Sequence, residues 1–224
     1  SVANGITHAV VTPHIYAGRW DNRLSNLGKV FLDYQRALAA ADIPLQIYLG
    51  GEVHILPDAF TLMDSHDLPQ IGVWRGYKVI LLELPHSHIP AGVLKAIDMF
   101  IRAGYLPMIA HPERNKEVMR NVKRLEPLLK AGCLVQLTAA SVCGKFGAPA
   151  HKTALRLLDN GWATVVATDA HNLAHRPPIM AEARATLDEL FSEDAGEVLT
   201  DANPRTIIEG REEFQATPAT PVAA

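Results

Sequence analysis

Short apolar runs in this 224-residue chain repeatedly end in a residue whose side chain can bind a metal ion. The residues at these ends are His14, Glu52, Glu83, His111 and the pair Asp169 and His171. Strands that place titratable residues at their carboxyl ends form the active sites of α/β barrels. Imidazole and carboxylate ligands without thiolate suit Mn, Zn or Fe better than a structural zinc site. The pattern predicts a metal centre built from several strand ends.

The local setting of these residues strengthens the prediction. Asp169 and His171 are two positions apart after an apolar run, so an extended chain points both side chains to the same face. Glu52 and Glu83 also follow apolar runs, and a carboxylate there must be paired or metal-bound, since unpaired burial is costly. Taken singly, Asp169 could be a helix cap, the glutamates could form salt bridges, and His14 could be an ordinary core or loop residue.

Two arginines lie close to the predicted ligands in the sequence. Arg114 comes three residues after His111, and Arg176 comes five residues after His171. A guanidinium group beside a metal cluster can hold two phosphate oxygens in a fork. We therefore take Arg114, Arg176 and His111 as candidate catalytic residues, with a surface ion pair as the alternative for either arginine.

The other histidines carry weaker signals. His86 and His88 have the spacing of a metal pair, but they precede Pro90, and we expect a loop there. The remaining histidines have no comparable setting: His8, His54, His66, His151 and His175.

Strand-like and helix-like segments alternate along the chain, which predicts an α/β fold with a parallel sheet. Runs rich in Val, Ile and Leu predict strands at 8–12, 45–50, 78–84, 107–110, 133–138 and 163–168. Helical spacing of apolar residues appears at 22–41, 90–103, 117–131, 149–160 and 178–191, and Asn203-Pro204 predicts a last helix with Asn203 as its cap. An open doubly wound sheet fits this alternation, but ligands at five strand ends favour a closed or nearly closed barrel.

Composition narrows the possible functions. The chain is 48% hydrophobic with a net charge of −3, so it lacks the basic field needed for nucleic acid or an anionic membrane, and no run is long enough to insert into a bilayer. Two cysteines form no disulfide framework, which favours the reducing cytoplasm. Neither cysteine has an arginine six positions later, so a cysteine-phosphatase loop is absent, and there is no Gly-x-Ser-x-Gly elbow.

We expect one domain over residues 1–214 and a disordered tail over 215–224, which is rich in Pro, Thr and Ala. The opening Ser1-Val-Ala-Asn-Gly5 has the pattern of a helix end, with glycine just beyond it. A helix end without its beginning suggests that the natural N-terminus precedes Ser1.

Several segments together resemble a known family. They are Thr12-Pro13-His14, Gly51-Glu52, Glu83-Leu84-Pro85, Ala110-His111-Pro112-Glu113-Arg114-Asn115, Gly144-Lys145-Phe146-Gly147 and Thr168-Asp169-Ala170-His171-Asn172. The chain resembles, over about residues 1–195, the bacterial polymerase-and-histidinol-phosphatase (PHP) superfamily. Within it, the AHPERN segment is typical of the CpsB/CapC-like, metal-dependent protein-tyrosine phosphatases of capsule and exopolysaccharide operons.

The resemblance implies a distorted (β/α)7 TIM-like barrel with up to three metals, most often Mn2+, with Fe, Zn or Mg as alternatives. It implies metal ligation by His14, Glu52, Glu83, His111, Asp169 and His171, and phosphate binding by Arg114 and Arg176. Glu52, Glu83 and His111 would form one intact metal site. The family's first strand, which carries Asp-x-His-x-His, is absent, so the other two sites would be incomplete and the barrel would have an open seam.

The resemblance also implies a substrate: a phosphotyrosine protein, such as the tyrosine-rich tail of a tyrosine autokinase that acts as a polysaccharide co-polymerase. An open seam would leave strand edges that allow oligomers to form. Two alternatives remain. The chain could hydrolyse a small phosphate monoester such as histidinol phosphate, or it could be a non-catalytic, kinase-binding regulatory module.

Overall fold

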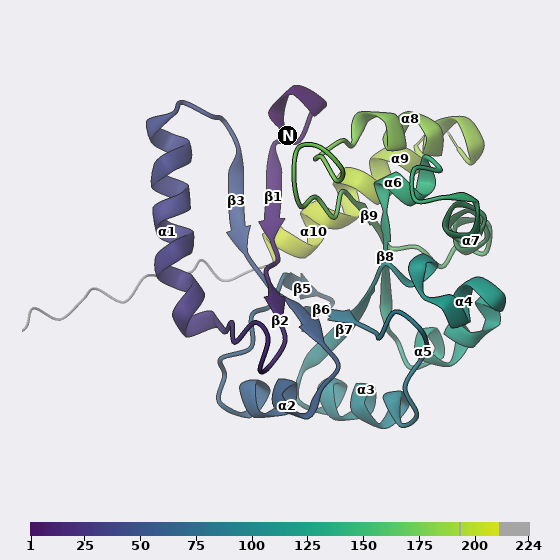
Figure 1. The fold of residues 1–224 in the computed structure, drawn as a ribbon, viewed down its shortest axis with the longest axis horizontal. Helices are drawn as coiled ribbons and strands as arrows, with labels where there is room; N and C mark the ends of the chain where they lie inside the picture. Colours follow the sequence, from purple (N-terminus) through teal and green to yellow (C-terminus); the bar gives the residue numbers. More distant parts are fainter. Residues whose placement is uncertain (193, 211–224) are drawn as a thin grey trace, which may run out of the picture.

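The computed structural model describes residues 1–192 and 194–210, in which helices surround a central set of strands (Figure 1). The strands are β1 (His8–Val11), β2 (His14–Ile15), β3 (Gln46–Leu49), β4 (Glu52–His54), β5 (Gly72–Trp74), β6 (Tyr77–Glu83), β7 (Tyr105–Ala110), β8 (Leu134–Thr138) and β9 (Val165–Ala167). The α-helices are α1 (Leu24–Ala40), α2 (Pro57–Asp64), α3 (Val93–Arg102), α4 (Lys116–Arg120), α5 (Glu126–Lys130), α6 (Ala139–Val142), α7 (Ala148–Asp159), α8 (Ala181–Leu190), α9 (Ala195–Glu197) and α10 (Asn203–Glu209).

The strands confirm the predicted α/β fold with a parallel sheet. The larger sheet has the order β2-β4-β6-β7-β8-β9, and every neighbouring pair on this path is parallel. The first two predicted strands are observed as the parallel pair β1 and β3, and each is followed by a short strand that was not predicted, β2 and β4. Because neighbouring strands on this path are parallel, their carboxyl ends lie at the same edge of the sheet.

The strand pairing does not close the larger sheet into a barrel within the described residues. It ends at β2 on one side and at β9 on the other, and in residues 1–192 and 194–210 no pairing joins these two strands. The barrel expected from the sequence therefore stays a prediction, whereas its parallel strand order is observed.

Strand β6 shows how the core is divided between two faces of the sheet. Val79 and Leu81 pack into one cluster with residues of β7, β9 and α10, while Ile80 and Leu82 pack into the larger cluster formed with the outer helices. The carboxylate of Glu83 follows in the same alternation as Val79 and Leu81. The Glu83 side chain therefore points to the same face of the sheet as Val79 and Leu81.

Some helical predictions need correction. The single helix expected at 117–131 is wrong: it is divided into α4, a 3-10 turn (Val122–Leu125) and α5, because the extended backbone of Asn121 ends α4 and the Asn121 side chain caps the turn. The expected cap at Asn203 is also wrong. Helix α9, a π-helical turn (Val198–Ala202) and α10 follow without a break, so Asn203 lies within this run and donates a hydrogen bond to the carbonyl of Thr164 instead.

Helix α2 and the antiparallel strand β5 are among the elements that were not expected from the sequence. Strand β5 supports α10 closely: a Cβ added to Gly72 would lie 2.1 Å from the carbonyl oxygen of Ile207. Glycine at position 72 therefore allows the C-terminal helix to pack against the sheet. The opening residues form a 3-10 turn (Val2–Asn4) that ends at left-handed Gly5, as the sequence suggested. The expected disordered tail at 215–224 lies outside the described residues.

No helix within the described ranges combines the length and the apolar character that crossing a membrane would require.

Candidate metal centre

Histidine and carboxylate side chains from four strand ends converge at the carboxyl edge of the sheet. His111 Nε2 lies 3.0 Å from Glu52 Oε1, and His14 Nδ1 lies 2.9 Å from the other carboxylate oxygen of Glu52. Glu83 lies 3.7 Å from both His14 and His111. The predicted residues His14, Glu52, Glu83 and His111 are thus brought together.

The donor atoms form two overlapping groups of three. One group is Glu52, Glu83 and His111, the trio expected to form an intact site, and the other is His14, His54 and Glu83. Within each group the potential ligand atoms lie within 4.8 Å of one another. Glu83 belongs to both groups, so its carboxylate would contribute to the binding of a metal in either one.

The chemistry of this donor set fits divalent metals. Buried polar atoms are normally hydrogen-bonded, yet buried His14 Nδ1 and Glu83 Oε2 have only close ion-pair neighbours, Glu52 and His54, and no contact with hydrogen-bond geometry in the described part of the chain. Only imidazole nitrogens and carboxylate oxygens are present in the two groups. Such nitrogen and oxygen donors suit Mn, Fe or Zn.

Mutual contact sets the charge of the cluster. Burial alone would raise the pKa of Glu52, but the hydrogen bond with His111 and the contact with His14 hold that pKa well below its ordinary value. Contact with the Glu52 carboxylate raises the pKa of His14. Burial opposes protonation of His111, and the hydrogen bond with Glu52 overcomes this effect and raises the pKa of His111. Glu52 is therefore ionised near neutral pH, which a cation ligand requires.

His54 is a member of the cluster that the sequence analysis missed. Its Nε2 lies 2.5 Å from Glu83 Oε2, and its ring lies 4.4 Å from the ring of Tyr16. The signal was available in the sequence, because His54 follows Glu52 by two positions in one strand. The same rule that joined Asp169 to His171 places both side chains on one face.

Arg114 and Arg176 converge on a different residue, Asp169. Both guanidinium groups bind Asp169 Oδ2, with Arg114 Nη1 at 2.5 Å. Two cations directed at one anionic oxygen make this corner suitable for a phosphate oxygen. Phe146 lies beside both arginines: its ring centroid is 4.8 Å from Cζ of Arg114 and 5.8 Å from Cζ of Arg176.

Two predicted ligands lie at the margin of the donor groups. Asp169 faces the arginines and belongs to neither group, and His171 is exposed, 3.7 Å from Asp169 and with its ring 5.9 Å from that of His14. Their role as ligands stays a prediction. His86 and His88 lie in the loop after β6, as expected, and join neither group.

The segment after β7 explains why these residues occur together. His111 has a left-handed backbone, φ 33°, which turns the chain sharply where the strand ends. The next carboxylate, Glu113, is completely buried and accepts a hydrogen bond from the backbone N–H of Thr138; burial raises its pKa. Asn115 caps α4 and donates hydrogen bonds to two carbonyls of the loop after β6. The segments that follow Glu83 and His111 are thereby tied together.

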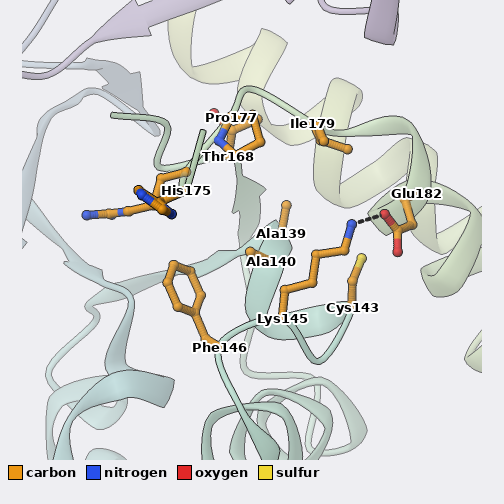
Figure 2. Close-up of a pocket in the computed structure, with 11 residues that line it drawn as sticks. Ala139, Ala140, Cys143, Lys145, Phe146, Thr168, His175, Pro177, Ile179 and Glu182 are labelled. Atoms are coloured by element: carbon orange, nitrogen blue, oxygen red, sulfur yellow. Dashed lines mark hydrogen bonds and ion pairs between the residues drawn. The ribbon is translucent and has the colours of Figure 1, made fainter. Parts of the chain in front are cut away.

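A cavity lined by Arg176 adjoins the corner where the two arginines meet, and Figure 2 shows the residues around the cavity. The lining residues Phe146 and Arg176 also belong to the arginine corner, whereas Ala140, Pro177 and Ile179 form other walls of the cavity. Its volume is about 60 Å³, and it is partly open to solvent. At its edge Lys145 forms an ion pair with Glu182.

The fold and the site define an α/β protein with a His/carboxylate metal-type cluster beside an anion-binding arginine pair. Comparison with known sequences identifies its class: residues 1–209 match the family described as "Capsular polysaccharide synthesis, CpsB/CapC", and the chain belongs to this family. The resemblance seen in the motifs is thereby confirmed.

Individual relatives agree with this assignment. Over 175 residues the chain is 30% identical to "Putative tyrosine-protein phosphatase CapC" of Staphylococcus aureus, covering 78% of this chain and 68% of that protein. Over 218 residues it is 29% identical to "Tyrosine-protein phosphatase YwqE" of Bacillus subtilis, covering 97% and 84%. Its structure is similar, with a TM-score of 0.85 and 29% identity over 100% of this chain and 88% of the other, to one described as "Crystal structures of YwqE from Bacillus subtilis and CpsB from Streptococcus pneumoniae, unique metal-dependent tyrosine phosphatases".

Proposed function

We propose that this chain is a metal-dependent protein-tyrosine phosphatase of capsule or exopolysaccharide synthesis. The observation that carries the proposal is the position of two His/carboxylate donor groups next to two converging arginines, in a chain that matches the family over residues 1–209. The relatives named tyrosine-protein phosphatases support the reaction and the substrate class.

The residues divide the work between metal and phosphate. Glu52, Glu83 and His111 would hold one metal, and His14 with His54 and Glu83 a second, with Mn2+ the favoured ion. When bound there, a divalent metal lowers the pKa of a coordinated water and neutralises phosphate charge. Arg114 and Arg176 bind the equatorial phosphate oxygens and stabilise their charge as the ester bond breaks.

The leaving group requires little help from the protein. A tyrosine phenolate has a pKa of about 10, so it departs with little protonation. No cysteine nucleophile is required either, because burial and the nearby Glu182 raise the pKa of Cys143, and burial raises that of Cys133 to about 12. Both cysteines stay as unreactive thiols near neutral pH, so we expect direct hydrolysis without a phosphoenzyme.

We also propose a distorted PHP-type barrel for residues 1–214, as a single domain. The inner cluster supports it: Val10 of β1 packs against the same cluster as Val165 of β9, although β1 belongs to the separate strand pair and β9 ends the larger sheet on the side away from β2. Side chains shared across such a sheet are expected when it curls toward closure. The proposed setting is the cytoplasm, with a tyrosine autokinase as the phosphorylated partner and oligomers possible.

A substrate panel tests the function. The chain loaded with Mn2+ is offered a phosphotyrosine peptide, O-phosphoserine and histidinol phosphate, and kcat/KM is compared for the three. We expect the phosphotyrosine peptide to be preferred. Preference for histidinol phosphate would assign the site to a small-metabolite phosphatase, and binding of a tyrosine autokinase without any hydrolysis would identify a regulatory module.

A further inference from the structure

One cavity lies where a substrate held by the arginine pair would extend. It shares Arg176 and Phe146 with the arginine corner, so an ester whose phosphate lies on Arg114 and Arg176 has its remaining atoms next to the cavity. Figure 2 shows Phe146, Ala140, Pro177 and Ile179 arranged around this space.

We propose that this cavity is the subsite for the aromatic ring of an aryl phosphate ester. The inference rests on the proposed phosphatase function and assigns the part of the site that would select aryl esters over aliphatic ones.

The walls match the two halves of such a substrate. The phosphate end carries two negative charges and meets two guanidinium groups, and buried Arg176 Nε has no hydrogen-bond partner in the described part of the chain, so one donor is still available to a ligand. The other half is a flat apolar ring, which gains by contact with Phe146 and with the aliphatic walls. An aliphatic phosphate ester would reach the same arginines but leave the apolar walls uncovered.

The charged residues at the cavity edge argue against a second anion site. Apart from Arg176, Lys145 is the one lysine or arginine among the lining residues, and Glu182 neutralises it through an ion pair. His175, also in the lining, is exposed to water. The cavity therefore offers apolar surface and one available guanidinium donor, which favours a ring attached to a phosphate over a second phosphate.

Two substitutions alter the cavity in opposite ways without touching the arginines. Ile179→Ala removes part of one wall, and Ala140→Leu fills the space from another. The matched control is Ile43→Ala, since Ile43 is 43% exposed, Ile179 is 36% exposed, and Ile43 lies in the loop before β3 and does not line the cavity. Each protein is loaded with Mn2+, and KM is measured for phosphotyrosine and for O-phosphoserine, together with the inhibition constant of inorganic phosphate.

We expect both cavity variants to raise KM for phosphotyrosine by about fivefold, which is typical of losing a few apolar contacts. The KM for O-phosphoserine and the inhibition constant of inorganic phosphate stay within about twofold of the unsubstituted protein, because neither ligand has a ring that fills the cavity. Ile43→Ala leaves all three unchanged.

The outcomes separate the subsite from the function. Equal changes for both esters, or no change for phosphotyrosine, would overturn the subsite while leaving the phosphatase function intact. Absence of metal-dependent hydrolysis of either ester by the unsubstituted chain would overturn the proposed function and the subsite with it.

Discussion

Glu83 is the residue whose replacement affects the predicted metal centre most strongly. It is the one carboxylate common to both donor groups, so Glu83→Gln removes a charged ligand from each. Its side chain is 18% exposed, and glutamine has nearly the same size, so the backbone of β6 needs no rearrangement. The substitution therefore isolates the ligand charge from packing.

The size of the effect follows from ligand linkage. Loss even of residues that only support a ligand weakens metal affinity by about 10- to 100-fold, so we take about 100-fold for a direct ligand. With metal well above its dissociation constant, this removes about 2.7 kcal/mol of metal-linked stability. For a chain of this length the loss corresponds to a decrease of about 5–10 °C in the melting temperature of the metal-loaded protein.

Thermal unfolding with and without Mn2+ measures this directly. We expect Mn2+ to raise the melting temperature of the unsubstituted chain and to raise that of Glu83→Gln much less, with activity lost in parallel. Glu189→Gln, on the exposed face of α8, is the matched control and keeps the full shift. An unchanged Mn2+ shift in Glu83→Gln would refute the assignment of Glu83 as a shared ligand.

Three further predictions concern the phosphate corner and the cysteines. Arg114→Ala is expected to raise KM or lower kcat by at least about tenfold, because Arg114 is predicted to bind the phosphate. Bound metal, measured on the same sample, should stay unchanged, since Arg114 contacts Asp169 and not the donor groups. Loss of metal together with activity would show that the role of Arg114 is structural. Phe146→Leu keeps the apolar contact but removes the aromatic ring beside the two guanidinium groups. We therefore expect Phe146→Leu to raise the inhibition constant of inorganic phosphate about threefold, and Phe146→Tyr, which keeps a ring, to leave it unchanged. An equal defect in both variants would contradict this role. Cys143→Ser should keep kcat within about twofold of the unsubstituted chain, and inactivation by this substitution would indicate a cysteine mechanism. A thiol reagent at pH 8 should leave Cys133 unmodified until the chain is denatured, since burial raises the pKa of Cys133 to about 12.

Most of the parallel strands could be predicted from the sequence, because strands buried on both faces are continuous apolar runs. The carboxyl ends of such strands share one edge, and this rule predicted that the candidate ligands meet there, whereas the grouping of Glu52, Glu83 and His111 as one site was implied by the family resemblance. Strand β5 could not be predicted in the same way. It has only three residues, and it is defined by an antiparallel contact with β6 and by the approach of α10 to Gly72.

The sequence predicted the types of metal ligand at the site, but not every residue of the cluster or which side chains contact one another. His54 was missed because it was judged as an isolated histidine rather than as the second residue after Glu52 in one strand. The pairing of Asp169 with two arginines was also not predictable, since it depends on the loop after β9 folding back toward Arg114. Sequence spacing indicates which residues share a face, whereas contacts between loops depend on tertiary structure.

The most direct test of a metal-dependent phosphatase is a titration of this chain, freed of metal with a chelator, with Mn2+. Bound metal and the hydrolysis rate of p-nitrophenyl phosphate are measured on the same samples. We expect the rate to rise in proportion to bound Mn2+ and to disappear again when the chelator is added. Folded protein that binds Mn2+ without hydrolysis, or hydrolyses the ester equally well without metal, would contradict the proposed function.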